Sequence, residues 1–233
     1  MKKAVLFDLD GVLLDSWDFV YKAFEYTLKL HKHPLPSKEI INKVMGKPLM
    51  EFYKFVLQTS PKNESSSNES SSLDEELFLV DQRVELYAKT HREYQVNKID
   101  LNRLFPNVKS VLKKLKLKGY VIGVVSNRSR GSLLKSIDLA KISKYIDIVV
   151  SVQDVKNPKP HKEHVLTALK KLKVKAENAY MVGDTDADIL AGKNAGVKTI
   201  GVTYGFIGKD IKKFKPDFII DNMKELMQVL KMV

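Results

Sequence analysis

The sequence contains no cysteine. This absence excludes disulfide bonds, thiol nucleophiles and zinc sites with cysteine ligands. The chain also lacks an apolar run of the roughly 20 residues that a membrane-spanning helix needs. No hydrophobic segment with a cleavage site is found at the N-terminus, where Met1-Lys2-Lys3 leads directly into an expected strand. We therefore expect a cytoplasmic protein with no membrane partner.

Arginine is scarce, because only five of the 40 basic residues are arginine and the others are lysine. The net charge of +12 raises the question of a nucleic-acid partner, whose phosphates bind clustered basic residues. The lysines are instead spread along expected helices, for example at Lys109, Lys113 and Lys116, which indicates solvated helix faces. Nucleic acid is therefore not the expected partner.

Short apolar segments alternate with helical patterns from about residue 107 onward. Together with residues 4–7 they make six expected strands, at residues 4–7, 120–125, 146–150, 179–182, 197–202 and 218–220. Expected helices include residues 108–118, 161–172 and 187–195. Apolar strands that alternate with helices are typical of a parallel sheet covered on both faces. We predict an α/β fold with a Rossmann-like core of three layers.

The stretch from residue 17 to about 104 breaks this alternation. It has apolar residues at three- and four-residue steps over 17–30, 37–44, 49–57 and 73–96, which predicts helices and no strand. We therefore expect a catalytic core of residues 1–15 and 106–233 with an inserted helical domain at 16–105. Within the insert, residues 60–72 are rich in Ser and Asn and have almost nothing apolar, which predicts a flexible loop.

Two carboxylates, Asp8 and Asp10, end the first apolar run. Two negative charges at such a short separation repel each other, so both carboxylates stay ionised only if a cation lies nearby. One carboxylate could attack an electrophilic phosphorus while the other protonates the leaving oxygen. A calcium loop of the EF-hand type is not expected, because Phe19 stands where that loop needs an acidic residue.

Polar residues also follow other expected strands. Ser126 and Asn127 come after the second strand and suit hydrogen bonding to a phosphate oxygen, although a helix N-cap is an alternative. Lys159 lies between two prolines before an expected helix and would offset the charge of a phosphoryl group. Because ligands of parallel sheets bind beyond the carboxyl ends of the strands, we expect these groups to converge.

A second acidic cluster, Gly183-Asp184-Thr185-Asp186-Ala187-Asp188, follows the fourth strand. It does not match an EF-hand, since Ile189 stands where that loop needs glycine. Asp186 is typical of the start of a helix. We predict that Asp184 and Asp188 bind Mg²⁺, because a site with carboxylates alone suits this hard cation.

The order of these motifs along the chain resembles the haloacid dehalogenase superfamily, and most of all its phosphoglycolate phosphatase-like group. The resemblance covers the whole chain and implies that the helical insert is a cap that closes over the substrate. The motifs that carry it are Asp8-Leu9-Asp10-Gly11-Val12, Ser126-Asn127, Lys159-Pro160, and Gly183-Asp184-Thr185 followed by Asp188-Ile189, Ala191-Gly192 and Ala195-Gly196.

The resemblance implies that Asp8 is a nucleophile that becomes phosphorylated. Asp10 would act first as general acid and then as base for the hydrolytic water. Mg²⁺ would be bound by the Asp8 carboxylate, the Asp10 backbone carbonyl and Asp184, and Asp188 would support this metal site.

The resemblance also implies how the substrate is held. Ser126, the Asn127 backbone and Lys159 would bind the transferring phosphoryl group. Gly46 and Lys47, in Gly46-Lys47-Pro48, resemble the loop of the cap that selects the substrate, although an ordinary turn explains this segment equally well. Two further candidates for contact with a substrate anion are Arg103 and Arg128.

The expected function is magnesium-dependent hydrolysis of a small phosphorylated metabolite, of the phosphoglycolate or sugar phosphate type, through an aspartyl-phosphate intermediate. A phosphomutase of the β-phosphoglucomutase type is an alternative, but its cap loop commonly has Arg where this chain has Lys47. Dehalogenation is not expected, since Asp10 is usually replaced in true dehalogenases. A phosphonatase would need a Schiff-base lysine in the cap, and because the cap has many lysines the sequence alone does not exclude it. A non-enzymatic nucleic-acid-binding protein is the alternative from another class.

Overall fold

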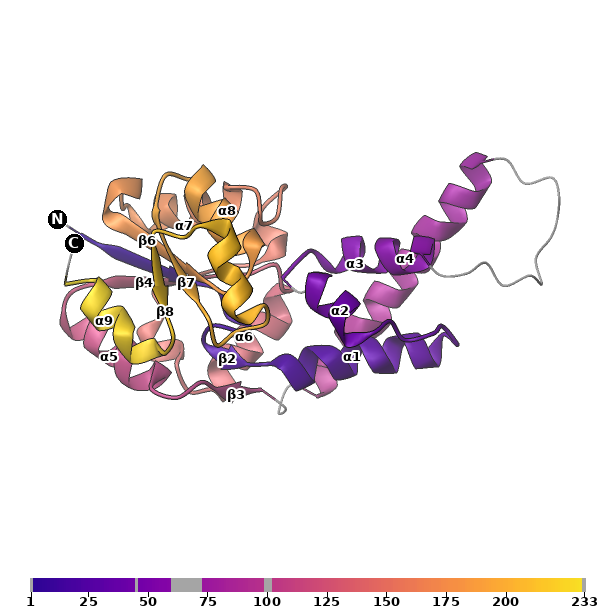
Figure 1. Ribbon diagram of the computed structural model, residues 1–233, viewed down its shortest axis with the longest axis horizontal. Helices are drawn as coiled ribbons and strands as arrows, with labels where there is room; N and C mark the ends of the chain where they lie inside the picture. Colours follow the sequence, from indigo (N-terminus) through magenta and orange to yellow (C-terminus); the bar gives the residue numbers. More distant parts are fainter. Residues whose placement is uncertain (1, 45, 60–72, 99–101, 232–233) are drawn as a thin grey trace.

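The computed structural model describes residues 2–44, 46–59, 73–98 and 102–231. A core built around a sheet lies beside an elongated group of helices (Figure 1). The predicted flexible loop at residues 60–72 lies outside the described residues. None of the helices in the described part of the chain is long and apolar enough to cross a membrane.

Six parallel strands form the sheet of the core, in the order β5-β4-β1-β6-β7-β8. The α/β fold and the six predicted strands are confirmed, with small differences at their ends. The strand expected from residue 146 begins at Ile148, because a short 3₁₀ helix at Ser143–Tyr145 precedes it. The strands are β1 (Ala4–Phe7), β4 (Val121–Val125), β5 (Ile148–Val150), β6 (Ala179–Gly183), β7 (Lys198–Val202) and β8 (Phe218–Ile220).

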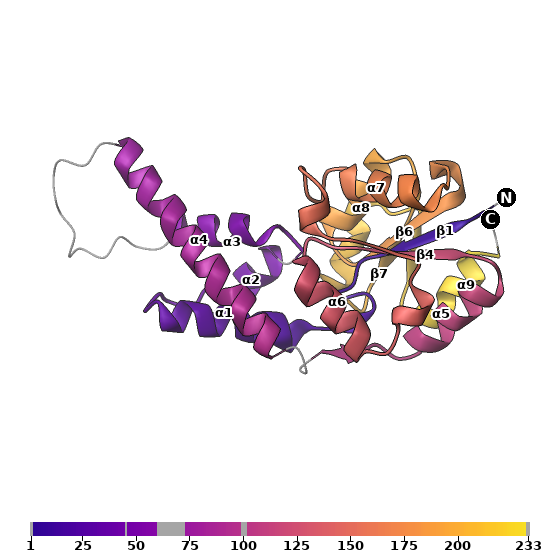
Figure 2. The ribbon, with the colours of Figure 1, turned by 180° about the vertical axis from the view of Figure 1, so that it is seen from behind.

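Helices cover both faces of this sheet, as Figures 1 and 2 show. One face packs against α5 (Val108–Leu117), α6 (Arg130–Leu139) and α9 (Leu226–Val229), and the other against α7 (Glu163–Leu172) and α8 (Asp186–Asn194). Because successive side chains of a strand point to opposite faces, Val5 and Phe7 join one apolar cluster and Ala4 and Leu6 join the other. The sheet is therefore buried on both sides, as its continuous apolar runs predict.

Two core helices were not predicted, α6 and the short α9. The buried face of α6 includes Ser132 and Ser136 beside Leu133 and Ile137. Serines at these positions interrupt the apolar spacing from which a helix is recognised. Short 3₁₀ helices also occur at Val152–Asp154, Ala176–Asn178, Gly208–Phe214 and Met223–Glu225.

A two-stranded ribbon joins the core to the helical part. Strand β2 (Leu14–Asp15) pairs antiparallel with β3 (Arg103–Leu104), where the chain leaves and re-enters the core. The expectation of no strand between residues 17 and 104 was wrong at β3, because a two-residue strand is too short to show an alternating pattern. The ribbon lies at the expected domain boundaries, which stay a prediction.

The helical part, which we call the cap, consists of α1 (Trp17–Leu30), α2 (Lys38–Val44), α3 (Leu49–Thr59) and α4 (Leu73–Asn97). It has an apolar cluster of its own, separate from those of the core. Aromatic side chains dominate this cluster, and the rings of Phe24 and Phe52 lie 3.9 Å apart between centroids. Burial of such large side chains is the main stabilising contribution to a small helical unit.

Candidate active site

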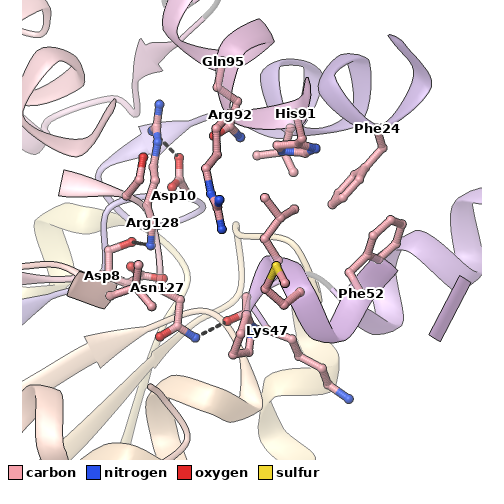
Figure 3. A pocket seen from close by; sticks show the side chains of 18 of the residues that line it. Asp8, Asp10, Phe24, Lys47, Phe52, His91, Arg92, Gln95, Asn127 and Arg128 are labelled. Atoms are coloured by element: carbon pink, nitrogen blue, oxygen red, sulfur yellow. Dashed lines mark hydrogen bonds and ion pairs between the residues drawn. The ribbon is translucent and has the colours of Figure 1, made fainter. Parts of the chain in front are cut away.

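A pocket lies between the core and the cap (Figure 3). The core side carries Asp8, Asp10 and residues 126–129, which follow the carboxyl ends of β1 and β4. The cap side carries residues 46–50 and part of α4. The site therefore lies where ligands of parallel sheets bind, beyond the carboxyl ends of the strands.

Asp8 follows β1 directly and is buried, with 5% of its surface exposed. Its Oδ1 accepts a hydrogen bond from the Leu9 amide at 2.7 Å and lies 3.2 Å from Lys159 Nζ. Its Oδ2 makes no hydrogen bond or ion pair within the described ranges of the chain. Burial raises the pKa of Asp8 to about 7, and the nearby Asp188 and Asp10 add to the effect while Lys159 opposes it.

Lys159 is 1% exposed, and its ammonium group is held by three oxygens. Nζ donates to Val125 O at 3.0 Å and to Asp188 Oδ1 at 2.6 Å, besides its contact with Asp8. Burial disfavours its charge, but Asp188 and Asp8 outweigh this effect and raise the pKa of Lys159. The lysine is therefore a fixed cation beside Asp8, although Pro158 is only partly buried and Pro160 is exposed.

Asp188 holds both Lys159 and the start of α8. Its Oδ2 accepts from the amides of Asp184 and Thr185 at 3.2 and 3.1 Å and from Thr185 Oγ1 at 2.8 Å. Asp8, Asp184 and Asp188 each offer one carboxylate oxygen within 4.8 Å of the others. Both oxygens of Asp188 already have partners, and these bonds hold Lys159 and the backbone of Asp184; its predicted role at the metal stays a prediction.

Asp184 has the free oxygen that a cation site needs. The residue is fully buried, and its Oδ2 accepts from the Phe206 amide at 2.7 Å while Oδ1 has no partner among the described residues. Burial raises its pKa well above the usual value, and Asp188 and Asp8 add to this shift. A buried carboxylate oxygen without a partner is unfavourable unless a cation meets it.

Two glycines keep open the space around Asp184. A Cβ atom at Gly11 or at Gly205 would collide with the Asp184 side chain. The donors at this point are all oxygens, with no histidine or cysteine in the described cluster. The residues thus fit a hard divalent cation such as Mg²⁺.

Asp10 lies at the wall of the pocket and is paired with Arg128 (Figure 3). Arg128 Nη1 donates to Asp10 Oδ1 at 3.1 Å, and its Nε donates to Ser132 Oγ at 2.9 Å. The guanidinium also lies over the Phe19 ring, 4.5 Å from its centroid. Sequence reasoning singled out Arg128 as a contact for a substrate anion, and its pairing with Asp10 was not foreseen.

Ser126 and Asn127 lie where the sequence placed them, after β4. Ser126 is not the N-cap of the next helix, because Ser129 occupies that position before α6. The Asn127 side chain connects the cap to the core: Nδ2 donates to Gly46 O at 2.9 Å and to Lys159 O at 3.0 Å, and Oδ1 accepts from the Lys159 amide at 3.0 Å. These bonds leave the Asn127 backbone for other contacts.

In the predicted cap loop, Gly46 lies against the core and the Lys47 side chain lies in solvent. Gly46, with a φ of +80°, lies so close to α8 that a Cβ atom there would be 2.7 Å from Thr185 Oγ1. The Lys47 side chain is exposed and points away from the pocket carboxylates (Figure 3). Arg103, in β3, is exposed and is not part of the pocket wall.

Three residues of α4 line the pocket and were missed: His91, Arg92 and Gln95. Burial, together with the nearby Arg128 and Arg92, lowers the pKa of His91 to about 3, so the ring is neutral. The apolar spacing of α4 predicts a helix, but it does not tell which turn of that helix meets the core.

A family model described as haloacid dehalogenase-like hydrolase matches residues 5–202. A curated relative from Bacillus cereus, named pyrophosphatase PpaX, is 31% identical over 228 residues, covering 97% of this chain and 95% of the relative. A haloacid dehalogenase-like family hydrolase from Streptococcus pneumoniae has a similar structure, with a TM-score of 0.79, 24% identity and 98% of both chains covered. A β-phosphoglucomutase from Clostridium difficile has the same TM-score and identity over 100% of this chain and 96% of that one. The chain thus belongs to the haloacid dehalogenase-like hydrolase family.

Proposed function

We propose that the protein is a magnesium-dependent phosphatase that acts on a small phosphorylated metabolite through a phosphorylated Asp8. The observation that supports this best is that two buried groups, Lys159 and Asp184, lie beside Asp8, which lines the pocket. Asp8 has a free oxygen, Lys159 is a fixed cation 3.2 Å from its other oxygen, and Asp184 has a buried oxygen without a partner among the described residues. A nucleophile, a cation and a metal ligand are what phosphoryl transfer to a carboxylate needs.

Asp8, Asp184 and the backbone carbonyl of Asp10 would hold the Mg²⁺ ion, and Asp188 would orient Asp184 through its amide. When bound, the ion offsets the negative charges of the phosphoryl oxygens and of the carboxylates. This explains how Asp8 stays ionised at neutral pH although burial raises its pKa.

The first step is attack of Asp8 Oδ2 on phosphorus, with the bond between phosphorus and the leaving oxygen breaking. Lys159, the Ser126 hydroxyl and the backbone amide of Asn127 hold the phosphoryl oxygens. These donors offset the negative charge that the transition state spreads over the oxygens. Asp10 gives its proton to the leaving oxygen, so that a neutral alcohol departs.

The second step is hydrolysis of the aspartyl phosphate. Asp10, now a carboxylate, takes a proton from a water molecule that attacks phosphorus, which releases inorganic phosphate and regenerates Asp8. The Arg128 guanidinium holds the Asp10 carboxylate at the pocket wall through its bond to Oδ1. The cap covers the pocket and excludes bulk water during transfer.

The substrate class that we expect includes esters of the phosphoglycolate and sugar phosphate types. Relatives of this chain are named pyrophosphatases, so inorganic pyrophosphate belongs in the same set. The test is a phosphate-release assay over such a panel with Mg²⁺, with Asp8→Asn as the blank.

We expect release with Mg²⁺, none after EDTA treatment, and its return when Mg²⁺ is added back. Acid quenching should trap a phosphorylated parent chain and no phosphorylated Asp8→Asn chain. Activity in the Asp8→Asn variant would contradict the mechanism. Isomerised sugar phosphate without free phosphate would indicate a phosphomutase instead.

A further inference from the structure

Arg92 is a pocket residue that the proposed chemistry does not use. It lies on α4 of the cap and lines the same pocket as Asp8, Asp10 and Arg128. Its side chain extends from the helix into the pocket (Figure 3). Within the described part of the chain its guanidinium makes no hydrogen bond or ion pair. A cation aimed into a binding pocket without a protein partner is available to an anion of the ligand.

Arg128, on the core side of the pocket, has a second free donor. Its side chain is 5% exposed, and its Nη1 and Nε are bound by Asp10 and Ser132. Its Nη2 is buried and has no partner among the described residues. Buried N–H groups are nearly always satisfied in proteins, so this donor is also expected to meet an acceptor in the complex.

Arg92 reaches the pocket from the cap, whereas Ser126, Asn127 and Lys159 belong to the core. Of the carboxylates that line the pocket, Asp8 is paired with Lys159 and Asp10 with Arg128, which leaves none for Arg92. The ring of His91 beside them is neutral and adds no charge.

We propose that Arg92, together with Nη2 of Arg128, binds a second anionic group on the leaving part of the substrate. Preferred substrates then carry two anions, the transferred phosphoryl and either a carboxylate or another phosphate. This inference rests on the proposed function and narrows its substrate class. Both anions present paired oxygens that match the planar donors of guanidinium. Because Arg92 belongs to the cap and Arg128 to the core, the contact joins them over the bound substrate.

The test compares substrates that differ in one charge. 2-Phosphoglycolate is compared with its carboxamide, and inorganic pyrophosphate with methyl phosphate, all with Mg²⁺. We expect the parent to have the higher kcat/KM on the member with the second anion in at least one pair, and the contribution of Arg92 is the change in this ratio between parent and variant. Arg92→Gln should lower kcat/KM far more on the member with the second anion than on the other, so that the ratio within the pair falls about 10- to 100-fold relative to the parent, the range for a hydrogen bond to a charged group, while Arg92→Lys retains part of it.

Arg83→Gln is the matched control, since it removes the same charge from the same helix about two and a half turns away and outside the pocket. It should keep the parent's preference. If Arg92→Gln loses the preference only in the 2-phosphoglycolate pair, the site binds a carboxylate. If it loses the preference only in the pyrophosphate pair, the site binds a phosphate. An unchanged preference, or an equal loss on charged and neutral members, overturns the proposal.

A binding measurement separates this inference from the proposed function. In Asp8→Asn, calorimetry with Mg²⁺ should show tighter binding of 2-phosphoglycolate than of its carboxamide, or of pyrophosphate than of methyl phosphate. Adding Arg92→Gln should remove this difference. If the parent hydrolyses no ester yet the binding difference depends on Arg92, the proposed function fails and the anion site stands. If hydrolysis occurs but binding ignores Arg92, the anion site fails alone.

Discussion

Asp8 and Asp10 are separated by one residue, yet their surroundings differ. Asp8 lies in the core beside Lys159, while Asp10 lies at the pocket wall beside Arg128. A buried carboxylate next to a fixed cation suits attack, because it has lost the water that would compete with phosphorus. A carboxylate at the wall suits proton transfer to a leaving group. The spacing of the pair in the sequence predicts both roles, the resemblance implies which residue has which, and the different surroundings of the two carboxylates support that assignment.

Replacement of Asp10 by asparagine should slow catalysis by about 10²- to 10⁴-fold, the usual contribution of a general acid or base. The loss in kcat/KM should be smaller for p-nitrophenyl phosphate than for an alkyl phosphate, because nitrophenolate leaves without a proton. Steady-state kinetics on both esters measure this difference.

Asp15→Asn provides the control for Asp10→Asn. Asp15 is an exposed carboxylate of β2, five residues further along the chain, and its neutralisation should leave both rates unchanged. An equal loss of kcat/KM on the two esters in Asp10→Asn would show that Asp10 does not protonate the leaving group.

Gly205→Ala should weaken Mg²⁺ binding, because the new Cβ atom would collide with the Asp184 side chain and with Gly11 O. We expect the Mg²⁺ concentration for half-maximal activity to rise about 10- to 100-fold, as for other changes that disturb the support of a metal ligand. Gly131→Ala in α6 is the control, since a Cβ atom there meets nothing within 4 Å. A parent-like Mg²⁺ requirement in Gly205→Ala would contradict the assignment of Asp184.

At the level of helices and strands, the site was predictable where strands carry it. Asp8, Asn127 and Asp184 follow strands β1, β4 and β6, and parallel neighbours must bring their carboxyl ends to one edge. Residues on the cap were not predictable in this way. Arg92 lines the pocket because α4 packs against α1 and α3 of the cap and against α6 of the core, and these long-range contacts cannot be read from the spacing within the helix.

The loop between α2 and α3 touches the core at Gly46. Gly46→Ala would place a Cβ atom 2.7 Å from Thr185 Oγ1 and would strain a backbone with a φ of +80°. The loop should then move away from Asn127 and lose the bond to Gly46 O. We expect kcat/KM to fall about 10-fold or more, as for other small displacements of groups that position a substrate.

Gly119→Ala controls for backbone strain alone. Gly119 has the same φ of +80°, but a Cβ atom there meets nothing within 4 Å. This variant should lose roughly 1 kcal/mol of folding free energy, the cost of a left-handed conformation for a residue with a side chain, and should keep its kcat/KM. If both variants lose activity equally, the contact between Gly46 and Thr185 is not what matters.

At the scale of the whole molecule, the sequence predicts the three layers because continuous apolar runs, which fit strands buried on both faces, alternate with helices. It does not predict β2 and β3, whose two residues carry no pattern, or α6, whose buried serines hide its apolar face. The placement of the cap depends on contacts of this long-range kind. The ribbon of β2 and β3 fixes where the chain leaves and re-enters the core, and the Asn127 side chain bonds to Gly46 O of the cap.

Protonation of His164 links the stability of the core to pH. The ring is fully buried between α7 and β4, and its Nε2 donates to Ser126 O at 3.1 Å. Burial, with the nearby Lys159, lowers the pKa of His164 to about 4, against an ordinary value of 6.5. Because the unfolded chain takes up the proton first, the stability from the neutral ring is complete above pH 6.5 and is lost as pH falls toward 4.

His164→Gln should remove this dependence while keeping an N–H near Ser126 O. The stability of the parent minus that of the variant should fall by on the order of 3 kcal/mol between pH 7 and pH 4, from the shift in pKa and 1.36 kcal/mol per unit. Urea unfolding in EDTA at several pH values measures it. The stability of the parent is compared with that of the variant because Asp8 and Asp184 also titrate. Their raised pKa values make both proteins more stable as pH falls, opposite to the effect of His164, and this shared effect cancels in the comparison. Parallel pH curves for parent and variant would mean that His164 is not buried as a neutral ring.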